Sequence, residues 1–348
     1  MPIVTWHVGC TKTMADQMTL SQPLPILETR QLSKHYPRKT APAAWLSQVS
    51  IVPAVDQVSL TIHPGETLGL AGESGSGKST LARICVGLER PGAGSLKILG
   101  KTIDNPRRSQ LRQISRVVQL VFQDPGGSLD PRMTVAESLS EVWRIHPVDD
   151  ARPLVDKVAH SLQEVGLDYA DAGSYPHQLS GGQRQRVAIA RALAVNPRLL
   201  ILDEAVAALD ASIRADILNL LLDLQSQRGL AYLFISHDLA VLAQLAHRVA
   251  VMYRGRIVEL GPAERVLTQP LHPYTQALLS AMPTPTPGLR SVRITLPTTT
   301  LADDAVGSGC GFRDRCLNPR RDDKCRTSPP MLEPGSKHSA ACHYLEKL

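Results

Sequence analysis

The chain of 348 residues is long enough for one large domain or two smaller ones, and its 43% hydrophobic and 20% charged residues exclude a disordered chain. Aromatic residues make up only 4% and the formal net charge is a modest +6, so we expect no nucleic-acid partner. No run reaches the roughly 18 consecutive apolar residues of a membrane-spanning helix, and Leu218–Leu224, among the richest stretches, is short.

The first part of the chain predicts a leader followed by strands. Residues 1–25 contain no apolar block with a cleavage site of small residues, so they do not resemble a secretory signal and we interpret them as a loose leader. From residue 26 to 62, apolar and polar residues alternate in short runs that are typical of strands in a half-buried sheet. We therefore predict an antiparallel β subdomain here.

A strand, a glycine-rich turn and a helix come next. The apolar run Thr67–Ala71 predicts the strand, and the helical stretch Ser79–Leu88 follows the turn. Another strand is predicted at Ser95–Leu99, and a basic helical segment leads to a third strand at Val117–Phe122. This order of elements is the one in which nucleotide-binding turns are found.

A helical insertion separates these strands from a second set. Residues 133–165 have helical spacing throughout, so we predict a helical subdomain over about residues 124–185. Beyond it, helices predicted at Gln183–Val195, Ile213–Arg228 and Leu239–Ala246 alternate with strands predicted at Leu199–Asp203, Tyr232–Ser236, Val249–Tyr253 and Arg256–Leu260. Such alternation is typical of a parallel sheet covered on both faces.

The first glycine-rich turn predicts a phosphate site. It fits the pattern G-x-x-x-x-G-K-[ST] between a strand and a helix. Its residues are Gly72, Glu73, Ser74, Gly75, Ser76, Gly77, Lys78 and Ser79, with Thr80 next in the helix. Glycines let backbone N–H groups wrap around phosphate oxygens, and the helix adds its positive N-terminal end. We expect Lys78 to bind the outer phosphates and Ser79 to bind magnesium.

The buried strand at residues 199–203 delivers two carboxylates at its end. Asp203 is placed to hold magnesium, and Glu204 to orient and deprotonate the water that attacks a γ-phosphate. Because the phosphate turn and these carboxylates both follow predicted strands, the sequence predicts an α/β fold of the P-loop NTPase type that carries out phosphoryl transfer with Mg²⁺.

The string Leu179-Ser180-Gly181-Gly182-Gln183 resembles the signature of ATP-binding cassette (ABC) ATPases. A helix that starts at this string offers a serine and two glycine amides at its positive end, which suits a phosphate. In that family the phosphate is bound by the opposite subunit. The resemblance therefore implies a RecA-like core with an antiparallel β subdomain and a helical subdomain, and ATP held between two subunits.

The same resemblance implies roles for further single residues. Gln123, at the end of a strand, matches the glutamine that senses magnesium and water and communicates with the membrane partner. His237 matches the switch histidine, which contacts the γ-phosphate and holds Glu204 and the water in place. Tyr36 matches the aromatic residue that stacks on adenine.

One loop departs from the family pattern. Asp210 matches the residue that reaches across the dimer, but the family usually has a proline and a small hydroxyl residue between the glutamate and this aspartate. Here the run is Ala205-Val206-Ala207. The departure leaves open how firmly the loop contacts the partner subunit and whether both sites of a dimer are equivalent.

Two longer segments resemble the oligopeptide/dipeptide/nickel importer branch, and the chain is most similar to the second of its two paired ATPases. They are FQDPGGSLDPRM at residues 122–133 and HPYTQALL at residues 272–279. The resemblance implies a cassette domain over 26–270 and an extension over 271–348. It implies a peripheral subunit at the cytoplasmic face of the plasma membrane, paired with a second ATPase and with permease subunits, and indirectly with an extracytoplasmic binding protein.

The sequence leaves other cargoes and other functions as alternatives to peptide import. Peptides are favoured as cargo over nickel or another small solute. A soluble cassette protein that acts on ribosomes or DNA usually has two cassettes or a long coiled coil, and this chain has no internal repeat. A regulatory subunit without hydrolysis is disfavoured because the motif residues for hydrolysis are all present.

Four cysteines crowd the last forty residues. Cys310, Cys316, Cys325 and Cys342 have the spacing C-x5-C-x8-C-x16-C. Four thiolates suit a [4Fe–4S] cluster or a tetrahedral zinc ion, and the spacing lacks the C-x2-C pairs of zinc ribbons. The spacing also resembles the tail of the same importer branch, in which some members hold an iron–sulfur cluster. A cluster, zinc and metal-free thiols remain open, and the cluster is favoured.

Overall fold

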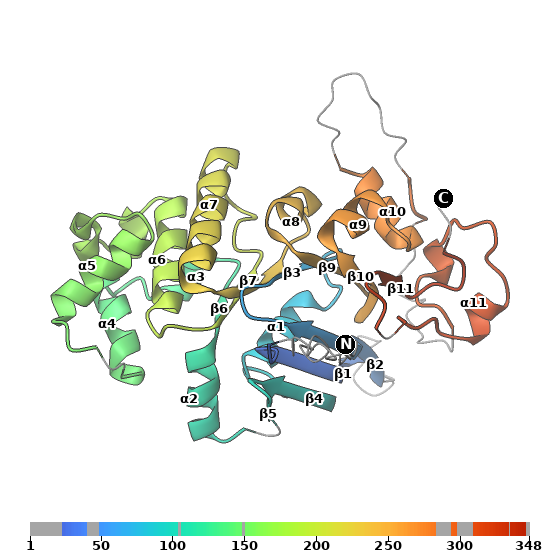
Figure 1. The fold of residues 1–348 in the computed structure, drawn as a ribbon, viewed down its shortest axis with the longest axis horizontal. Helices are drawn as coiled ribbons and strands as arrows, with labels where there is room; N and C mark the ends of the chain where they lie inside the picture. The colour runs from blue at the N-terminus through green and yellow to red at the C-terminus, as the bar shows by residue number, and fades with distance from the viewer. Residues whose placement is uncertain are drawn as a thin grey trace, which may run out of the picture.

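The computed structural model describes residues 23–39, 49–103, 106–147, 150–282, 294–297, 309–333 and 335–345. The predicted leader up to residue 22 lies outside this part of the chain. The described residues form an α/β arrangement of two sheets with helices around them (Figure 1), as the sequence predicts.

A seven-stranded sheet runs through the centre of the molecule in the order β11-β10-β9-β3-β8-β7-β6 (Figure 1). Its strands are β3 (Thr67–Ala71), β6 (Val118–Val121), β7 (Leu199–Asp203), β8 (Ala231–Ile235), β9 (Arg248–Tyr253), β10 (Arg256–Pro262) and β11 (Ser339–Ala340). The strands from β6 to β9 are parallel, whereas β10 and β11 pair antiparallel. The predicted parallel sheet is confirmed, with an added antiparallel edge.

Both faces of this sheet are buried. On β7, Leu200 and Leu202 enter one hydrophobic core, while Leu199 and Ile201 enter the other. Complete burial of such a side chain contributes roughly 1.5–3 kcal/mol. A strand buried on two faces needs apolar residues at every position, which explains the continuous apolar run in the sequence.

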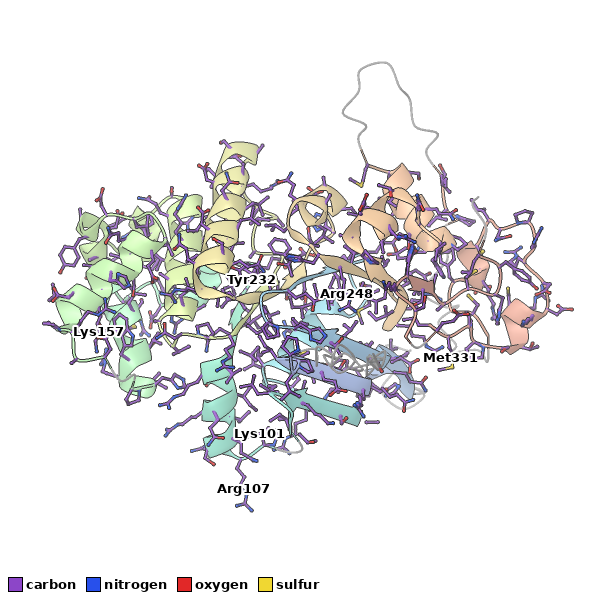
Figure 2. All side chains as sticks on the ribbon, in the orientation of Figure 1. Lys101, Arg107, Lys157, Tyr232, Arg248 and Met331 are labelled. Carbon is purple, nitrogen blue, oxygen red and sulfur yellow. The ribbon has the colours of Figure 1, made fainter. Side chains whose placement is uncertain are left out.

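Core side chains point into the molecule, whereas surface side chains point toward solvent (Figure 2). The ring of Tyr232 on β8 points inward and is wholly buried, and its hydroxyl donates a hydrogen bond to the Leu221 carbonyl oxygen at 2.7 Å. Arg107, just before α2 (Arg108–Val117), is exposed and points outward at the lower edge of the view. The buried tyrosine thus satisfies its polar end within the core, as a buried hydroxyl must.

A second, four-stranded sheet is antiparallel and has the order β2-β1-β4-β5. Its strands are β1 (Leu27–Lys39), β2 (Val49–Ile62), β4 (Ala93–Ile98) and β5 (Lys101–Thr102). β1 and β2 are longer than predicted, because register shifts between Thr29 and His35 let one strand pair continue through an irregular stretch. The predicted antiparallel sheet is confirmed.

Helices cover both faces of the central sheet. α1 (Lys78–Cys85) and α2 (Arg108–Val117) share a core with the four-stranded sheet. α7 (Ala211–Arg228), α8 (Leu239–Leu245) and α9 (Ala263–Thr268) share the other core. Among the described helices, none has the length and apolar character needed to cross a membrane.

A helical group lies at one end of the molecule (Figure 1). It comprises α3 (Pro125–Ser128), α4 (Val135–Ile145), α5 (Leu154–Glu164), two 3-10 turns (Tyr169–Gly173 and Pro176–Gln178) and α6 (Gly181–Leu193). The predicted helical stretch at 133–165 is divided into α4 and α5. Pro147 and Pro153 lie in the break, where a helix interior is disfavoured.

The C-terminal extension lies at the opposite end (Figure 1). Its elements are α10 (Pro273–Ser280), a 3-10 turn at Arg313–Arg315, α11 (Lys324–Thr327) and β11. β11 pairs with β10 through Glu259 and Ala340, so the extension adds the last strand to the central sheet.

Candidate functional site

The glycine-rich turn between β3 and α1 passes close to neighbouring backbone. Gly77 (φ 106°) immediately precedes α1, and a Cβ at this position would lie 1.9 Å from the Ala54 carbonyl oxygen. A Cβ at Gly72 (φ 150°) would lie 2.3 Å from the Met252 carbonyl oxygen. Both positions therefore require glycine, and the path of the loop depends on them. We call residues 72–79 the phosphate loop.

The predicted phosphate-binding lysine is folded back onto this loop. Lys78 is 4% exposed, and its Nζ donates hydrogen bonds to the carbonyl oxygens of Gly72 at 2.8 Å and Glu73 at 2.9 Å. Burial lowers the pKa of Lys78, while the nearby carboxylates of Glu204, Asp203 and Glu73 oppose this shift. Ser74 and Gly75 are exposed at the tip of the loop, where a ligand can reach them.

The structure places a buried carboxylate beside the loop. Asp203 ends β7, and its Oδ1 is buried without a hydrogen-bond partner in the described part of the chain. Burial raises the pKa of Asp203, and a hydrogen bond with Ser79 and the charge of Lys78 work in the opposite direction. An unpaired buried carboxylate oxygen next to a serine hydroxyl is the oxygen-rich environment that Mg²⁺ prefers.

Three predicted residues meet at Glu204. The Nε2 of Gln123 donates a hydrogen bond to Glu204 Oε2 at 2.9 Å, and the Nδ1 of His237 lies 3.5 Å from Oε1. Glu204 has a left-handed backbone (φ 48°), and its N–H donates to the Ile235 carbonyl oxygen. The Glu204 carboxylate is therefore contacted on one side by Gln123, which follows β6, and on the other by His237, which follows β8.

The predicted adenine-stacking residue lies on β1 next to α1. The side chain of Tyr36 is 38% exposed, and its hydroxyl donates a hydrogen bond to Glu89. Lys34 lies over the ring at 5.4 Å from the centroid. Burial and Glu89 raise the pKa of Tyr36, and a hydrogen bond with Thr80 of α1 works in the opposite direction. Thr80 therefore lies close to the Tyr36 hydroxyl. An exposed aromatic ring beside the helix that follows the phosphate loop is suitably placed to stack on a nucleotide base.

The signature residues lie at a different place from the phosphate loop. Ser180 caps α6, accepting a hydrogen bond from the Gln183 N–H at 3.2 Å while the Gln183 side chain accepts from Ser180 N–H. Gly182 packs against α7, where a Cβ would lie 2.6 Å from Ile213. Gly181 adjoins Leu209. Figure 1 shows α6 within the helical group and α1 beneath the central sheet.

The loop between β7 and α7 has the unusual alanine–valine–alanine run. Ala205 and Val206 are buried, and the exposed Asp210 precedes α7. Arg214 fixes this loop, because one guanidinium nitrogen donates to the Leu209 carbonyl oxygen at 3.0 Å and another lies 3.3 Å from Asp238. No motif in the sequence marks Arg214, since its contacts join two loops that only the fold brings together.

Another missed contact reaches the phosphate loop from the extension. Arg315 forms an ion pair with Glu73 across 242 positions of the chain. No motif in the sequence marks this arginine, and only its place just before Cys316 in the cysteine-rich tail sets it apart.

The four cysteines of the extension line one cavity of about 20 Å³, together with His272 and Phe312 among others. Burial raises the pKa of Cys310 to about 11, and the other three thiols add to this rise. The described residues nevertheless contain no group of three or more His, Cys, Asp or Glu side chains arranged to hold a metal ion. The predicted ligands of an iron–sulfur cluster are thus close together but do not have metal-ligand geometry.

Comparison with known proteins finds two family models that match parts of the chain, and several relatives. Residues 55–207 match the family model for ABC transporters, and residues 258–325 match that for the oligopeptide/dipeptide transporter C-terminal region. The probable peptide ABC transporter ATP-binding protein y4tS of Sinorhizobium fredii is 44% identical over 320 residues, which cover 91% of this chain and 89% of that protein. The glutathione import ATP-binding protein GsiA of Escherichia coli (strain K12) is 48% identical over 78% of this chain, which spans only 43% of that protein.

Solved structures share the fold. The dimeric ATP-binding cassette MJ0796, bound to ADP and Pi in a post-hydrolysis state, has 28% identity and a TM-score of 0.59, covering 68% of this chain and 98% of that one. CbiO1 from Clostridium perfringens, part of an ABC transporter complex, has 26% identity and a TM-score of 0.59, covering 70% and 91%. The chain belongs to the ABC transporter family, among the ATP-binding proteins that carry the oligopeptide/dipeptide transporter C-terminal region.

Proposed function

We propose that this chain binds and hydrolyses ATP to drive an ABC importer, and that Glu204 is its general base. The observation that carries the proposal is the position of Glu204, which is held by Gln123 and His237 next to the phosphate loop and Asp203. A carboxylate fixed in this way can orient a water molecule for attack on a phosphate.

The phosphate loop and its neighbours would bind the nucleotide. Residues 72–80 would surround the phosphates, Lys78 would exchange its carbonyl partners for phosphate oxygens, and Tyr36 would stack on the adenine ring. Ser79, Asp203 and Gln123 would hold Mg²⁺, which supplies positive charge to the phosphate oxygens. The unpaired Oδ1 of Asp203 supports this assignment.

In the hydrolytic step, Glu204 takes a proton from a water molecule as the water oxygen bonds to the γ-phosphorus. The bond from that phosphorus to the β–γ bridging oxygen breaks, and its electron pair leaves with ADP. His237 keeps the Glu204 carboxylate in place and contacts the γ-phosphate.

Ser180, Gly181, Gly182 and Gln183 would bind the γ-phosphate of a nucleotide on a second cassette, and Asp210 would contact that subunit. The dimeric state of the MJ0796 cassette supports a two-subunit arrangement. We propose a heterodimer with a related ATPase, bound to permease subunits at the cytoplasmic face of the plasma membrane and served by an extracytoplasmic binding protein. The cassette would comprise residues 26–270 and the extension residues 271–348.

We infer that the cargo is a peptide, because the relatives are named for peptide and glutathione import and glutathione is itself a small peptide. Nickel or another small solute is the alternative cargo, and a cassette protein without a transport role is the alternative class. Co-purification of the tagged chain with a polytopic permease separates transport from the second alternative. Uptake of a labelled dipeptide by the assembled complex, competed by Ni²⁺ or by other peptides, separates the cargoes.

The decisive variant is Glu204→Gln, which keeps the shape of the side chain and removes its basicity. We expect ATP hydrolysis to fall by about 10²-fold or more, while affinity for MgATP is retained. Glu264→Gln, at an exposed position of α9, is the matched control and should leave both unchanged. Near-normal turnover by the Glu204→Gln variant would refute the general-base role.

We also propose that the four cysteines of the extension rearrange from the positions described above, which do not have metal-ligand geometry, to bind a [4Fe–4S] cluster, with zinc as the alternative. The support is their shared cavity. Because burial raises the pKa of Cys310, Cys316 and Cys342, the thiols must release protons on binding, and uptake should improve as pH rises. Iron, sulfide and zinc should be measured per chain after anaerobic purification. Protein with none of the three removes this proposal.

A further inference from the structure

The phosphate loop is held from outside by the C-terminal extension. The two terminal nitrogens of Arg315 donate to the two carboxylate oxygens of Glu73, at 2.8 Å and 3.0 Å. This paired geometry fixes both the distance and the orientation of the two groups, unlike a single contact between mobile side chains. Glu73 is the second residue of the phosphate loop, so the ion pair acts on the loop itself.

The extension also contacts the backbone of the same residue. The Glu73 N–H donates a hydrogen bond to the Tyr274 hydroxyl oxygen at 2.9 Å, and the tyrosine ring is wholly buried. On its other side, the Glu73 carbonyl oxygen accepts hydrogen bonds from Lys78 Nζ at 2.9 Å and from the Ser76 N–H at 3.2 Å. One residue therefore links the extension to the lysine of the phosphate loop.

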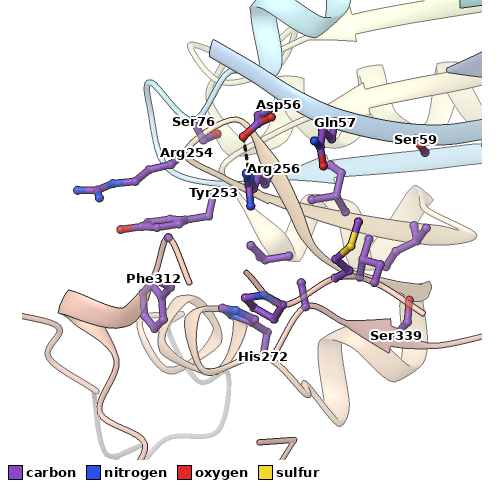
Figure 3. A pocket seen from close by; sticks show the side chains of 18 of the residues that line it. Asp56, Gln57, Ser59, Ser76, Tyr253, Arg254, Arg256, His272, Phe312 and Ser339 are labelled. Carbon is purple, nitrogen blue, oxygen red and sulfur yellow. Dashed lines mark hydrogen bonds and ion pairs between the residues drawn. The ribbon is translucent and has the colours of Figure 1, made fainter. Parts of the chain in front are cut away.

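The arginine is itself held in place. The ring of Tyr253 packs against Phe312 and Tyr274, with ring centroids 5.3 Å and 4.7 Å away, and Figure 3 shows Tyr253 above Phe312 among the residues that line a pocket. The Arg315 guanidinium lies 5.8 Å from the centroid of the Tyr253 ring, and its side chain is 18% exposed. Because Phe312 is buried and only three positions from Arg315, it anchors the short turn that presents the arginine.

The charge of Glu73 explains why its pairing with Arg315 matters for ATP binding. Glu73 lies near the place proposed for the phosphates, because its carbonyl oxygen is 2.9 Å from Lys78 Nζ and its carboxylate is among those that oppose the lowering of the Lys78 pKa by burial. An unpaired carboxylate there would repel the phosphates. Arg315 neutralises it, and the bond to Tyr274 keeps the start of the loop in one conformation.

We propose that Arg315 and Tyr274 are positioning residues for ATP binding, so that the extension is a working part of the nucleotide site. The inference rests on the proposed function of the phosphate loop. Arg315 acts through Glu73, to which both of its terminal nitrogens donate, and the proposal assigns it no direct contact with the nucleotide.

The test measures the Kd for MgATP of the full chain in the Glu204→Gln background, which prevents hydrolysis during the titration. We expect Arg315→Gln to weaken binding about tenfold, the size of a lost charge-assisted contact with one charge left unpaired. Arg315→Lys should recover part of the affinity. Arg313→Gln is the matched control, because Arg313 lies in the same turn and pairs with Asp314 instead, and it should stay within about twofold of the parent.

A double variant separates positioning from general stability. The double variant Glu73→Gln/Arg315→Gln also lacks the repelling charge of Glu73. It should therefore bind MgATP more tightly than Arg315→Gln alone, and a merely structural role of Arg315 would not produce this recovery. Tyr274→Phe should weaken binding about threefold through the lost acceptor for the Glu73 N–H. The melting temperature without nucleotide shows whether each variant is folded.

The outcomes are distinct. If the parent chain does not bind MgATP, the proposed function fails. If the parent binds but Arg315→Gln binds equally well, the inference fails and the proposed function stands. The inference also fails if the double variant is as weak as Arg315→Gln or weaker, since the effect then does not act through Glu73.

Discussion

Glu204 shows how a single backbone conformation can serve chemistry. Its φ of 48° lies in the left-handed region, which costs a residue with a side chain roughly 1 kcal/mol or more. The hydrogen bond from its N–H to the Ile235 carbonyl oxygen holds this conformation. The chain therefore turns sharply after β7, and the carboxylate faces Gln123 and His237.

His272 provides a prediction about pH at the same scale. The ring is 1% exposed, burial lowers its pKa to about 3, and its Nδ1 accepts a hydrogen bond from the Tyr274 N–H at the start of α10. The folded state binds a proton less readily than the unfolded chain, whose histidine has a pKa of about 6.5. Stability contributed by the neutral ring is thus complete above pH 6.5 and is lost as pH falls from 6.5 toward 3.

The comparison variant is His272→Asn, which keeps a polar acceptor at the start of α10 and does not titrate. Between pH 6.5 and 5, the wild type should lose about 1.6 kcal/mol more free energy of unfolding than the variant, because the slope rises from about 0.7 kcal/mol per pH unit at pH 6.5 toward about 1.4 kcal/mol per unit below it. Urea unfolding curves at several pH values measure this difference. Carboxylates titrate in both proteins and cancel, so parallel curves would contradict a neutral buried ring.

At the scale of elements, helices and strands were predicted most accurately where the local pattern of apolar residues alone determines the secondary structure. The run at residues 199–203 is apolar at every position because β7 is buried on both faces, and the predicted strand has the bounds of β7. The break between α4 and α5 was missed because the helical spacing continues on both sides of it. β5 has only two residues, too few for any periodicity.

Contacts between distant elements could not be predicted in this way. The pairs Gln123–Glu204 and Glu73–Arg315 join residues 81 and 242 positions apart, and hydrophobic periodicity carries no information about such partners. The motif residues were found because their order in the sequence resembles a family. Arg315 belongs to no motif, so only the fold reveals it.

The loop between β7 and α7 illustrates a compensation within the fold. It lacks the proline and small hydroxyl residue that its family usually has, and Ala205 and Val206 are packed into the core instead. Arg214 holds the following turn through the Leu209 carbonyl oxygen and links it to Asp238, next to His237. Burial and this arginine thus give the loop a defined conformation without proline.

At the scale of the whole molecule, the central sheet places the two glycine-rich sites in different surroundings. The helical group with α6 lies at one end, the extension lies at the other, and α1 lies between them beneath the sheet (Figure 1). Ser180 is exposed at the start of α6, where its hydroxyl and its N–H both pair with Gln183 of the same helix. If Ser180 binds a phosphate as proposed, this arrangement favours a second subunit as its source.

Two substitutions test that arrangement in the assembled transporter and in the isolated chain. Lys78→Ala should weaken the isolated chain's own affinity for MgATP by at least about tenfold, because it removes the charge that we propose contacts phosphate directly. Ser180→Arg should leave that affinity within about twofold but reduce ATP hydrolysis by the transporter about 10²-fold, since it blocks the phosphate of the partner's nucleotide. Ser226→Arg, at an exposed position of α7, controls for the added charge. Equal loss of nucleotide affinity in Ser180→Arg and Lys78→Ala would mean that both residues serve one pocket of one chain, and the two-subunit site would be wrong.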